Sequence, residues 1–156
     1  MKVLAEKDGF VLRQENDEIR ALGMFVMLGG LTRLYAEEAL FLFSDRVRQH
    51  IETGQYGLVY KKLDGGKLDG EIPVGFVTWA ELSAPCAMIF EQRLRPLQKS
   101  ELKSGSQLWV VDMCAPLGHG EITKGLFEQF KQPSGDYFAT RLREGKWRKE
   151  NFKMRA

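Results

Sequence analysis

Cysteine is scarce in this chain of 156 residues, and other marks of a secreted or membrane protein are missing as well. Its two cysteines, Cys86 and Cys114, cannot form the several disulfides that stabilise small secreted domains, and they lack the paired CxxC spacing of a zinc site. The longest apolar run, Leu22–Leu34, contains three glycines together with Thr32 and Arg33, so it is too short and too polar to span a bilayer. The N-terminal sequence has no apolar segment followed by a small-residue cleavage site, as a secretion signal would. We therefore expect a cytoplasmic protein without a transmembrane segment.

Neither sign of charge is in large excess, because 23 Lys and Arg residues face 21 Asp and Glu residues. The basic residues are nevertheless clustered. Seven of them, against two acidic residues, fall within 141–156, and a second group consists of Arg93, Arg95, Lys99 and Lys103. Such clusters attract anionic partners, although the solvated faces of two helices would show the same pattern. The low overall charge and the lack of a recognised motif argue against nucleic acid as the partner.

Composition and length indicate an ordinary globular domain. Apolar residues make up 44% of the chain and charged residues 28%, and no repeat or low-complexity segment occurs. A single domain over residues 1–156 is long enough to bury a substantial core without disulfides or a structural metal. The sequence contains no metal-ligand cluster, no Ser-His-Asp arrangement and no P-loop, so no bound metal or cofactor is expected.

The hydrophobic pattern predicts alternating helices and strands. Helices are expected over residues 21–53, 84–95 and 121–131, with a further helical turn opening at Pro96; strands are expected over 55–61, 72–80, 108–114 and 137–142. A glycine-rich turn, 63–70, makes a hairpin of the first two strands, and 143–156 forms a basic C-terminal tail. This order predicts an α/β fold with a central sheet flanked by helices.

Asp112 is the most informative single residue. It lies within the apolar strand sequence LWVVDMC, and a buried carboxylate is costly unless it is paired or functional. Desolvation would raise its pKa and suit it to act as a general base, or to orient one. The alternative is a structural aspartate that accepts hydrogen bonds from loop amides or from an arginine.

The loop after this strand, 115–120, offers a second candidate site. Gly118, His119 and Gly120 would allow close backbone approach to a donor group or an oxyanion at the start of the next helix. A plain strand-to-helix turn explains the glycines equally well, and a histidine in a surface loop is usually inert. From pattern alone, His50 is expected to be structural or on the surface, and Tyr35 to pack near the start of a helix.

Three segments of the chain resemble a known family. They are ALGMFVMLGGLTRLYAEEALFLF (21–43), PVGFVTWAELS (73–83) and WVVDMCAPLG (109–118). Together they are similar to the RTX toxin-activating lysine acyltransferases, the hemolysin-activating protein C family, whose typical blocks read PVAYCSWANLS and GDRKWFIDWIAPFG. The resemblance covers roughly residues 20–152, and residues 1–19 and the basic tail match only loosely.

The resemblance implies a fold like that of the GNAT acetyltransferases, with a central mixed sheet. It also implies transfer of a fatty acyl group from acyl carrier protein, or from acyl-CoA, to a lysine ε-amine on a protein or peptide. The family's catalytic aspartate corresponds to Asp112. The position of its catalytic histidine is occupied here by Tyr35, and a family asparagine by Arg46.

These correspondences lead to a division of roles. Tyr35 would donate a proton to the departing thiolate, and Asp112 would accept the proton of the attacking amine. An acidic carrier protein would be steered by basic residues, for which the candidates are Arg93, Arg95, Arg148 and Lys149. The alternative is a catalytically silent module of the same fold that binds a carrier protein or a secreted substrate. Association into a homodimer is left open.

Overall fold

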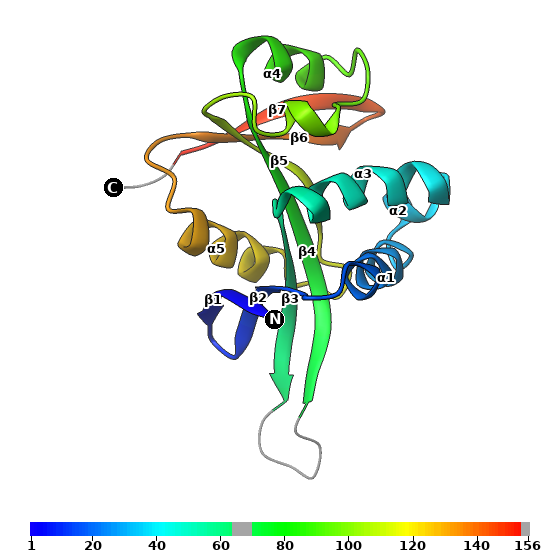
Figure 1. Cartoon of the computed structure of the whole chain (residues 1–156), viewed down its shortest axis with the longest axis vertical. Helices are drawn as coiled ribbons and strands as arrows, with labels where there is room; N and C mark the ends of the chain where they lie inside the picture. Colours follow the sequence, from blue (N-terminus) through cyan, green and yellow to red (C-terminus); the bar gives the residue numbers. More distant parts are fainter. Residues whose placement is uncertain (64–69, 154–156) are drawn as a thin grey trace. The chain divides into compact units, whose positions relative to one another are not determined.

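The computed structural model describes residues 1–63 and 70–153 of the chain. Within these residues the protein is a mixed α/β structure whose strands form one sheet in the order β1-β2-β3-β4-β5-β6-β7 (Figure 1). The pairing of β5 with β6 is parallel, whereas β1-β2, β2-β3, β3-β4 and β6-β7 are antiparallel. The predicted α/β class, with a mixed sheet flanked by helices as in GNAT-like acyltransferases, is confirmed.

The elements alternate along the chain. The strands are β1 (Lys2–Lys7), β2 (Phe10–Gln14), β3 (Tyr56–Leu63), β4 (Gly70–Leu82), β5 (Gln107–Cys114), β6 (Tyr137–Arg143) and β7 (Lys146–Phe152). The helices are α1 (Glu18–Gly29), α2 (Arg33–Ala36), α3 (Leu40–Thr53), α4 (Ala84–Glu91) and α5 (Gly120–Lys131), with a 3₁₀ turn η1 (Lys99–Glu101). None of the described helices is long and apolar enough to cross a membrane.

The chain divides into two compact units, each built from two segments. The first unit comprises Met1–Thr78 and Asp112–Gln132, and the second comprises Trp79–Val111 and Pro133–Ala156. The boundaries fall inside β4 and β5, so each of these strands contributes residues to both units.

The first unit begins with a β-hairpin that was not predicted, because residues 1–19 were left without an element. Strands β1 and β2 pair through a two-residue turn at Asp8 and Gly9, whose φ angles are 51° and 81°. An Asp-Gly pair between two apolar-patterned stretches favours this turn, because both central residues need positive φ. The signal was therefore present in the sequence. Helix α5 lies beside this hairpin in Figure 1, and the Gln129 side chain donates a hydrogen bond of 3.3 Å to the carbonyl of Glu6.

The helical region predicted over residues 21–53 is three helices rather than one. Helix α1 ends at the pair Gly29 and Gly30, and Thr32 then caps α2 by accepting a hydrogen bond from the Tyr35 amide. Helix α3 ends at Gly54, whose φ of 70° lies in the left-handed region that glycine adopts without strain. The break between α1 and α3 places Tyr35 on a separate short helix.

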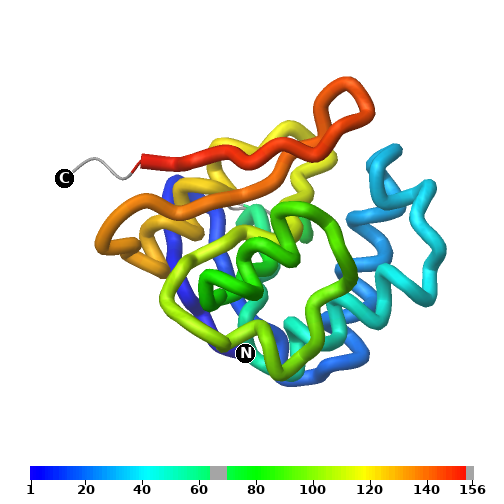
Figure 2. The backbone as a smooth tube through the Cα atoms, turned by 90° about the horizontal axis from the view of Figure 1, so that it is seen from above, coloured from blue at the N-terminus to red at the C-terminus, as the bar shows by residue number. Residues whose placement is uncertain are grey.

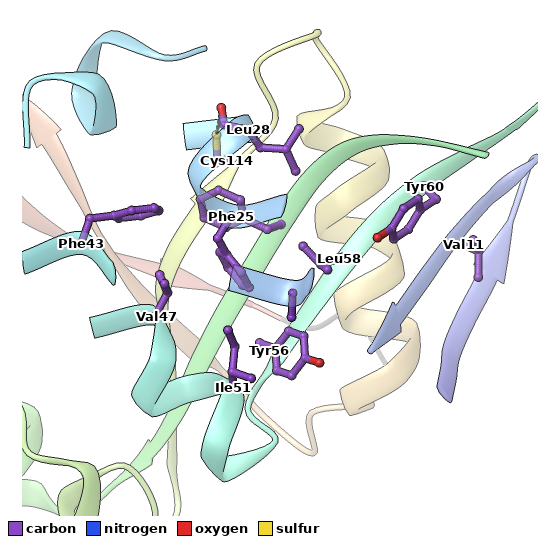
Figure 3. Close-up of a cluster of buried hydrophobic side chains, with 12 residues drawn as sticks. Val11, Phe25, Leu28, Phe43, Val47, Ile51, Tyr56, Leu58, Tyr60 and Cys114 are labelled. Atoms are coloured by element: carbon purple, nitrogen blue, oxygen red, sulfur yellow. Dashed lines mark hydrogen bonds between the residues drawn. The ribbon is translucent and has the colours of Figure 1, made fainter. Parts of the chain in front are cut away.

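The core of the first unit lies between α1, α3 and the sheet (Figure 3). Phe25 of α1 packs against Phe76 of β4 with ring centroids 4.6 Å apart, and α3 contributes Phe43 and Val47 to the same cluster. These side chains recur at three- and four-residue steps along each helix, so burying one face of the helix buries all of them. Phe76 is fully buried in this core.

The predicted hairpin of two strands is confirmed by the antiparallel pairing of β3 with β4. Both strands are longer than expected, and the intervening turn, apart from Leu63 and Gly70 at its ends, lies outside the described residues.

The second unit departs from prediction at its helices and at its end. The helix expected over 84–95 ends at Glu91, and the helical turn expected at Pro96 forms instead at Lys99–Glu101. Pro96 restricts the residue before it, Arg95, to extended backbone, which favours a helical turn that begins later in the chain. Trp109 is central to the unit, with an edge-on contact of 5.6 Å between its ring centroid and that of Phe90.

The basic tail expected over 143–156 is largely a strand. Residues Lys146–Phe152 form β7, which pairs antiparallel with β6 across a tight turn at Glu144 and Gly145. The φ angles of these turn residues are 52° and 73°, again the conformation of a two-residue hairpin turn. Figure 2 shows this hairpin as the orange and red chain that doubles back on itself. The interpretation of this charge cluster as the solvated face of a helix is therefore wrong.

Candidate functional site

The candidate site is built around Asp112, at the point where β5 enters the first unit. The residue is buried, with 6% of its surface exposed. Its backbone N–H donates to the hydroxyl of Thr78 on β4 at 3.0 Å, and that hydroxyl donates in turn to Asp112 Oδ2 at 3.3 Å. Two neighbouring strands therefore hold the carboxylate in one orientation.

Arg46 of α3 forms a two-point ion pair with this carboxylate. Its Nε donates to Asp112 Oδ2 and its Nη2 to Oδ1, each at 3.1 Å. The other edge of the guanidinium contacts Glu38, which lies between α2 and α3. Arg46 therefore bridges two carboxylates, and its side chain remains 33% exposed.

Tyr35 of α2 completes the cluster. Its hydroxyl lies near enough to Asp112 for each of the two groups to shift the pKa of the other. Its ring packs between Phe43 and Phe76, with centroids 5.4 and 5.6 Å away. The structure thus brings together the two residues, 77 positions apart, that were singled out as a catalytic pair. Whether they are catalytic stays a prediction.

The electrostatics of Asp112 differ from expectation. Burial is the largest effect and by itself would raise the pKa of this carboxyl. The charge and hydrogen bonds of Arg46 oppose it, aided by His50 and by the Tyr35 hydroxyl, and the pKa of Asp112 falls below its ordinary value of 3.8. The predicted rise in pKa is therefore wrong, because the arginine that compensates burial had not been foreseen. Asp112 is an anion at neutral pH.

The pKa of Tyr35 shifts in the opposite direction. Burial and the negative charge of Asp112 raise it well above the ordinary value of 10, and Arg46 offsets this only in part. The phenol therefore keeps its proton at neutral pH. The pair rests as a carboxylate beside a neutral hydroxyl.

Several residues near Asp112 were not expected there. His50, one helical turn after Arg46 on α3, is buried and contributes an electrostatic interaction with Asp112. The spacing of four residues places Arg46 and His50 on one face of the helix, which is the sequence signal that could have linked them. Glu38 carried no comparable signal, since it lies among other polar residues. Burial raises the pKa of the Cys114 thiol to about 11, which leaves it a weak nucleophile at neutral pH.

The glycine loop, residues 115–120, forms the turn that leads from β5 into α5. Gly118 has a φ of 89°, and His119 precedes α5, where its carbonyl accepts hydrogen bonds from the amide and hydroxyl of Thr123. The imidazole ring lies 5.1 Å, centroid to centroid, from the ring of Phe10. Gly120 is the first residue of α5. Binding of a donor at Gly118, His119 and Gly120 stays a prediction.

Three of the four basic residues proposed to steer a carrier make contacts within the second unit. The guanidinium of Arg93 lies 3.8 Å from the centroid of Trp147 and donates to Thr140 at 2.5 Å. The Lys149 ammonium lies 4.4 Å from the centroid of Phe138. Arg95 forms a two-point pair with Glu101, whose pKa is lowered to about 2 by that partner.

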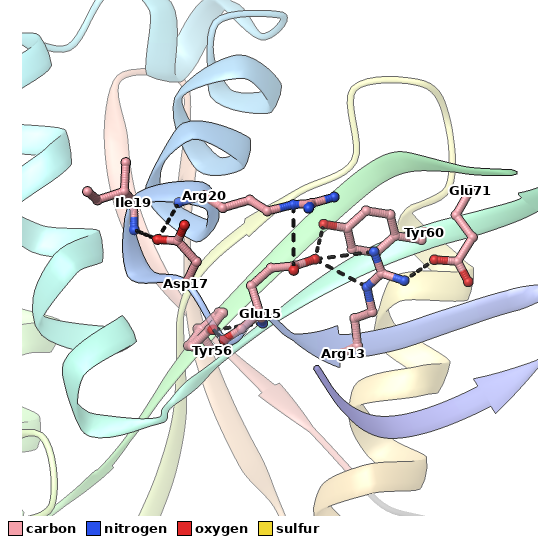
Figure 4. Close-up of polar contacts among 8 residues, drawn as sticks. All are labelled: Arg13, Glu15, Asp17, Ile19, Arg20, Tyr56, Tyr60 and Glu71. Carbon is pink, nitrogen blue, oxygen red and sulfur yellow. Dashed lines mark hydrogen bonds and ion pairs between the residues drawn. The ribbon is translucent and has the colours of Figure 1, made fainter.

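A second arginine cluster lies on β2, β3 and β4 (Figure 4). Arg13 pairs with Glu15 at 3.2 Å and with Glu71, and its guanidinium lies 3.6 Å from the centroid of Tyr60. The Tyr60 hydroxyl donates to Glu15 at 2.7 Å, and burial together with this contact raises the pKa of Tyr60 to about 12. Arg20 of α1 adds a longer ion pair to Glu15.

Among the described residues, no group of three or more His, Cys, Asp or Glu side chains is placed to hold a metal ion. The side chains gathered at Asp112 offer a fixed carboxylate, a phenol and a guanidinium.

Comparison with known proteins identifies relatives of the chain. The model of the family described as "HlyC: RTX toxin acyltransferase family" matches residues 14–151. The leukotoxin-activating lysine-acyltransferase LktC of Mannheimia haemolytica serotype A1 is 26% identical over 125 residues, which cover 76% of this chain and 68% of the relative. LktC of a Pasteurella haemolytica-like species (strain 5943B) is 28% identical over 104 residues, covering 63% of this chain and 58% of the relative.

A third relative carries a more specific name. The protein-lysine myristoyltransferase RtxC of Kingella kingae is 29% identical over 102 residues, covering 65% of this chain and 56% of the relative. The matched segments therefore span between somewhat over half and about two thirds of the length of these relatives.

Proposed function

This chain belongs to the RTX toxin acyltransferase family, and we propose that it transfers a fatty acyl group from an acyl thioester to the ε-amine of a lysine on a protein. The names of the relatives, which describe lysine acyltransferases that activate leukotoxins and a lysine myristoyltransferase, support this reaction class. We propose acyl carrier protein as the donor, an RTX-type toxin as the acceptor and the cytoplasm as the site of the reaction.

The reaction needs two proton transfers. The lysine nitrogen attacks the thioester carbonyl, a C–N bond forms and the C–S bond breaks. The nitrogen must lose one proton, and the departing sulfur must gain one. The products are an amide and the free thiol of the carrier, and no oxidant or reductant is needed.

We assign these transfers to the pair that the fold brings together. Asp112 accepts the proton of the nitrogen, which becomes far more acidic than a free ammonium once it has attacked the carbonyl. Tyr35 donates its proton to the sulfur. Transfer of a proton from Asp112 to the nearby Tyr35 then restores the resting state.

The pKa shifts constrain this mechanism. A free tyrosinate next to the Asp112 carboxylate is strongly disfavoured, because the pKa of Tyr35 is raised well above 10. Tyr35 must therefore release its proton together with cleavage of the C–S bond, while Asp112 takes up the proton from nitrogen. Arg46 and Thr78 hold the carboxylate in place during the exchange.

The observation that carries the proposal is the proximity of Tyr35 to the buried carboxylate of Asp112, which Arg46 and Thr78 hold in place. Side chains from α2 and β5 meet at a buried carboxylate, in a chain whose family is named for acyl transfer. Burying a carboxylate costs free energy, and the ion pair with Arg46 offsets that cost. A structural role for Asp112 therefore does not require that Tyr35 lie beside it as well.

The test is a transfer assay with defined donors. The protein is incubated with myristoyl-acyl carrier protein and an unacylated leukotoxin, and the toxin is analysed by intact mass and peptide sequencing. We expect a mass gain of one myristoyl group on lysine that survives hydroxylamine, which cleaves thioesters and leaves amides intact. Absence of the modification across a series of acyl chain lengths would overturn the proposal.

One observation favours the second candidate, a catalytically silent module of the same fold. Arg46 neutralises much of the charge of Asp112 and lowers its pKa, which weakens it as a base. The double variant Tyr35→His/Arg46→Asn installs the residue types of the family at both positions. Activity in this variant together with an inactive parent would establish the silent module; activity in both, with the variant's pH profile moved toward neutrality, supports the enzyme.

A further inference from the structure

The β6-β7 hairpin carries like charges directly opposite one another. Arg141 pairs with Arg148, and Arg143 pairs with Lys146, two rungs further toward the turn. Cross-strand partners lie on the same face of a sheet, so these four cations share one face. All four are exposed in the described structure. Like charges in opposed positions destabilise a hairpin, and here two such rungs occur together.

The opposite face of the hairpin has a structural explanation. The side chains on this face alternate with the four cations along the strands and include Thr140, Trp147 and Lys149. Arg93, just after α4, contacts both Thr140 and Trp147. Lys149 lies over the rings of Phe138 and Trp109. The charges on this side therefore serve packing within the second unit.

Among the residues that the structure describes, the four cations of this face are only partly compensated. Glu150 accepts from Arg141 at 3.3 Å and from Arg143 at 3.1 Å. One carboxylate thus faces four cations, and the face retains a marked positive charge. The repulsion among these cations destabilises the hairpin. An anionic partner surface that covers the face would offset this repulsion.

We propose that this face, defined by Arg141, Arg143, Lys146 and Arg148, docks the acidic surface of the carrier protein that delivers the acyl group. The inference rests on the proposed function, because it presumes a donor attached to a protein. This docking face keeps Arg148 from the four residues first proposed to steer a carrier. It leaves out Arg93, Arg95 and Lys149, because those residues make the internal contacts described above.

The geometry fits the carboxylates of a partner helix. Residues two apart on a strand are separated by about 6.5–7 Å. Carboxylates three or four positions apart on a helix are separated by about 5–6 Å, a similar spacing. A single-stranded nucleic acid would instead require exposed aromatic rings on the same face, and Trp147 lies on the other one.

The test compares two donors in the variant Arg141→Glu/Arg148→Glu. One donor is myristoyl-acyl carrier protein, and the other is myristoyl-pantetheine, which carries the same thioester without a protein surface. The charge-matched control is Lys2→Glu/Lys7→Glu on β1. Docking predicts that the ratio of kcat/KM between carrier protein and pantetheine falls about tenfold or more in the hairpin variant. In the control the ratio changes less than twofold.

A direct binding measurement keeps the proposal separate from the activity. Fluorescence anisotropy with labelled holo-acyl carrier protein should show binding that weakens about tenfold in the hairpin variant and with rising salt. If the parent transfers from neither donor, the proposed function fails while the anisotropy still decides the docking. An unchanged donor ratio with unchanged carrier binding in the hairpin variant would overturn the docking face. The milder variant Lys146→Gln provides a second check. If it leaves binding of the carrier protein unchanged but weakens binding of a nucleic acid, the docking face is also overturned.

Discussion

Two buried arginine clusters in the first unit are built from nearly the same parts. In each, an arginine lies between two carboxylates, and a tyrosine lies next to one of them. Arg13 has Glu15 and Glu71 as partners, with Tyr60 as the tyrosine. The corresponding set around Arg46 consists of Asp112, Glu38 and Tyr35.

The clusters differ in how far they are closed. The Arg13 side chain is 7% exposed and is stacked on Tyr60, within three adjacent strands. The Arg46 side chain is 33% exposed and lies between helices α2 and α3 and strand β5. The same chemistry is thus a closed ion-pair network in one place and a partly open one in the other. The residue types therefore do not distinguish the two clusters, whereas the exposure of the arginine does.

The largest expected difference between the clusters is in activity. Tyr35→Phe should reduce turnover about 10²–10⁴-fold, the usual contribution of one positioned proton donor, and Asp112→Asn at least as much. Tyr60→Phe, the matched change in the closed cluster, should leave turnover within about twofold. Turnover is measured with the transfer assay, and circular dichroism checks the fold. Full activity in Tyr35→Phe would show that this tyrosine serves packing alone.

Loss of the arginine should affect stability in the reverse order. Arg13→Met leaves Glu15 buried without its main cation and should cost about 3–5 kcal/mol of unfolding free energy. Arg46→Met should cost less, because the Arg46 side chain is 33% exposed against 7% for Arg13, so water can reach the carboxylate that the substitution leaves without its cation. Urea denaturation measures both. Equal losses would show that the difference in exposure has no energetic consequence.

Alkaline pH offers a third comparison, through the tyrosines. Both folded-state pKa values are raised, that of Tyr60 to about 12, whereas an unfolded tyrosine titrates near 10. Stability should therefore be intact below pH 10 and decline as the pH rises toward 12. Tyr60→Phe and Tyr35→Phe should each reduce this decline, as measured by urea midpoints at a series of pH values. A pH dependence identical to the parent in both variants would contradict the shifts.

The smallest expected effect concerns the outer carboxylates. Glu38 and Glu71 are 25% and 31% exposed, so the two clusters match at these positions. Glu38→Gln and Glu71→Gln should each cost about 1 kcal/mol or less, as is usual for partly exposed ion pairs. Thermal unfolding of the two variants beside the parent tests this. A loss several times larger in either one would show that its cluster depends on both carboxylates.

Parts of this fold and site could be predicted because their signals are local. The apolar strand around Asp112 predicted burial of a carboxylate, and the structure confirms it. The hairpin turns at Asp8-Gly9 and Glu144-Gly145 also had local signals, but three of their flanking strands, β1, β2 and β7, are rich in charge and were not assigned. Strands with one exposed face carry many polar residues, which weakens their hydrophobic pattern.

The partners of Asp112 had no such local signal. Arg46 lies 66 positions away, in a helix whose polar residues resemble a solvated face. Glu38 precedes that helix, and His50 was assigned to a structural or surface position. None of these could be connected to Asp112 from spacing, since only the packing of α3 against the sheet brings them within reach.

By itself, the amino-acid sequence determined the α/β class, the order of most elements, the burial of Asp112 and the resemblance to an acyltransferase family. These depend on the periodicity of apolar residues and on motifs, which are properties of neighbouring positions. The tertiary structure decided the protonation of the site. The pKa of Asp112 depends on a balance between burial, which raises it, and the charge of Arg46, which lowers it. The direction of the shift is set by the 3.1 Å contact between the two side chains, which forms only after α3 has packed against the sheet.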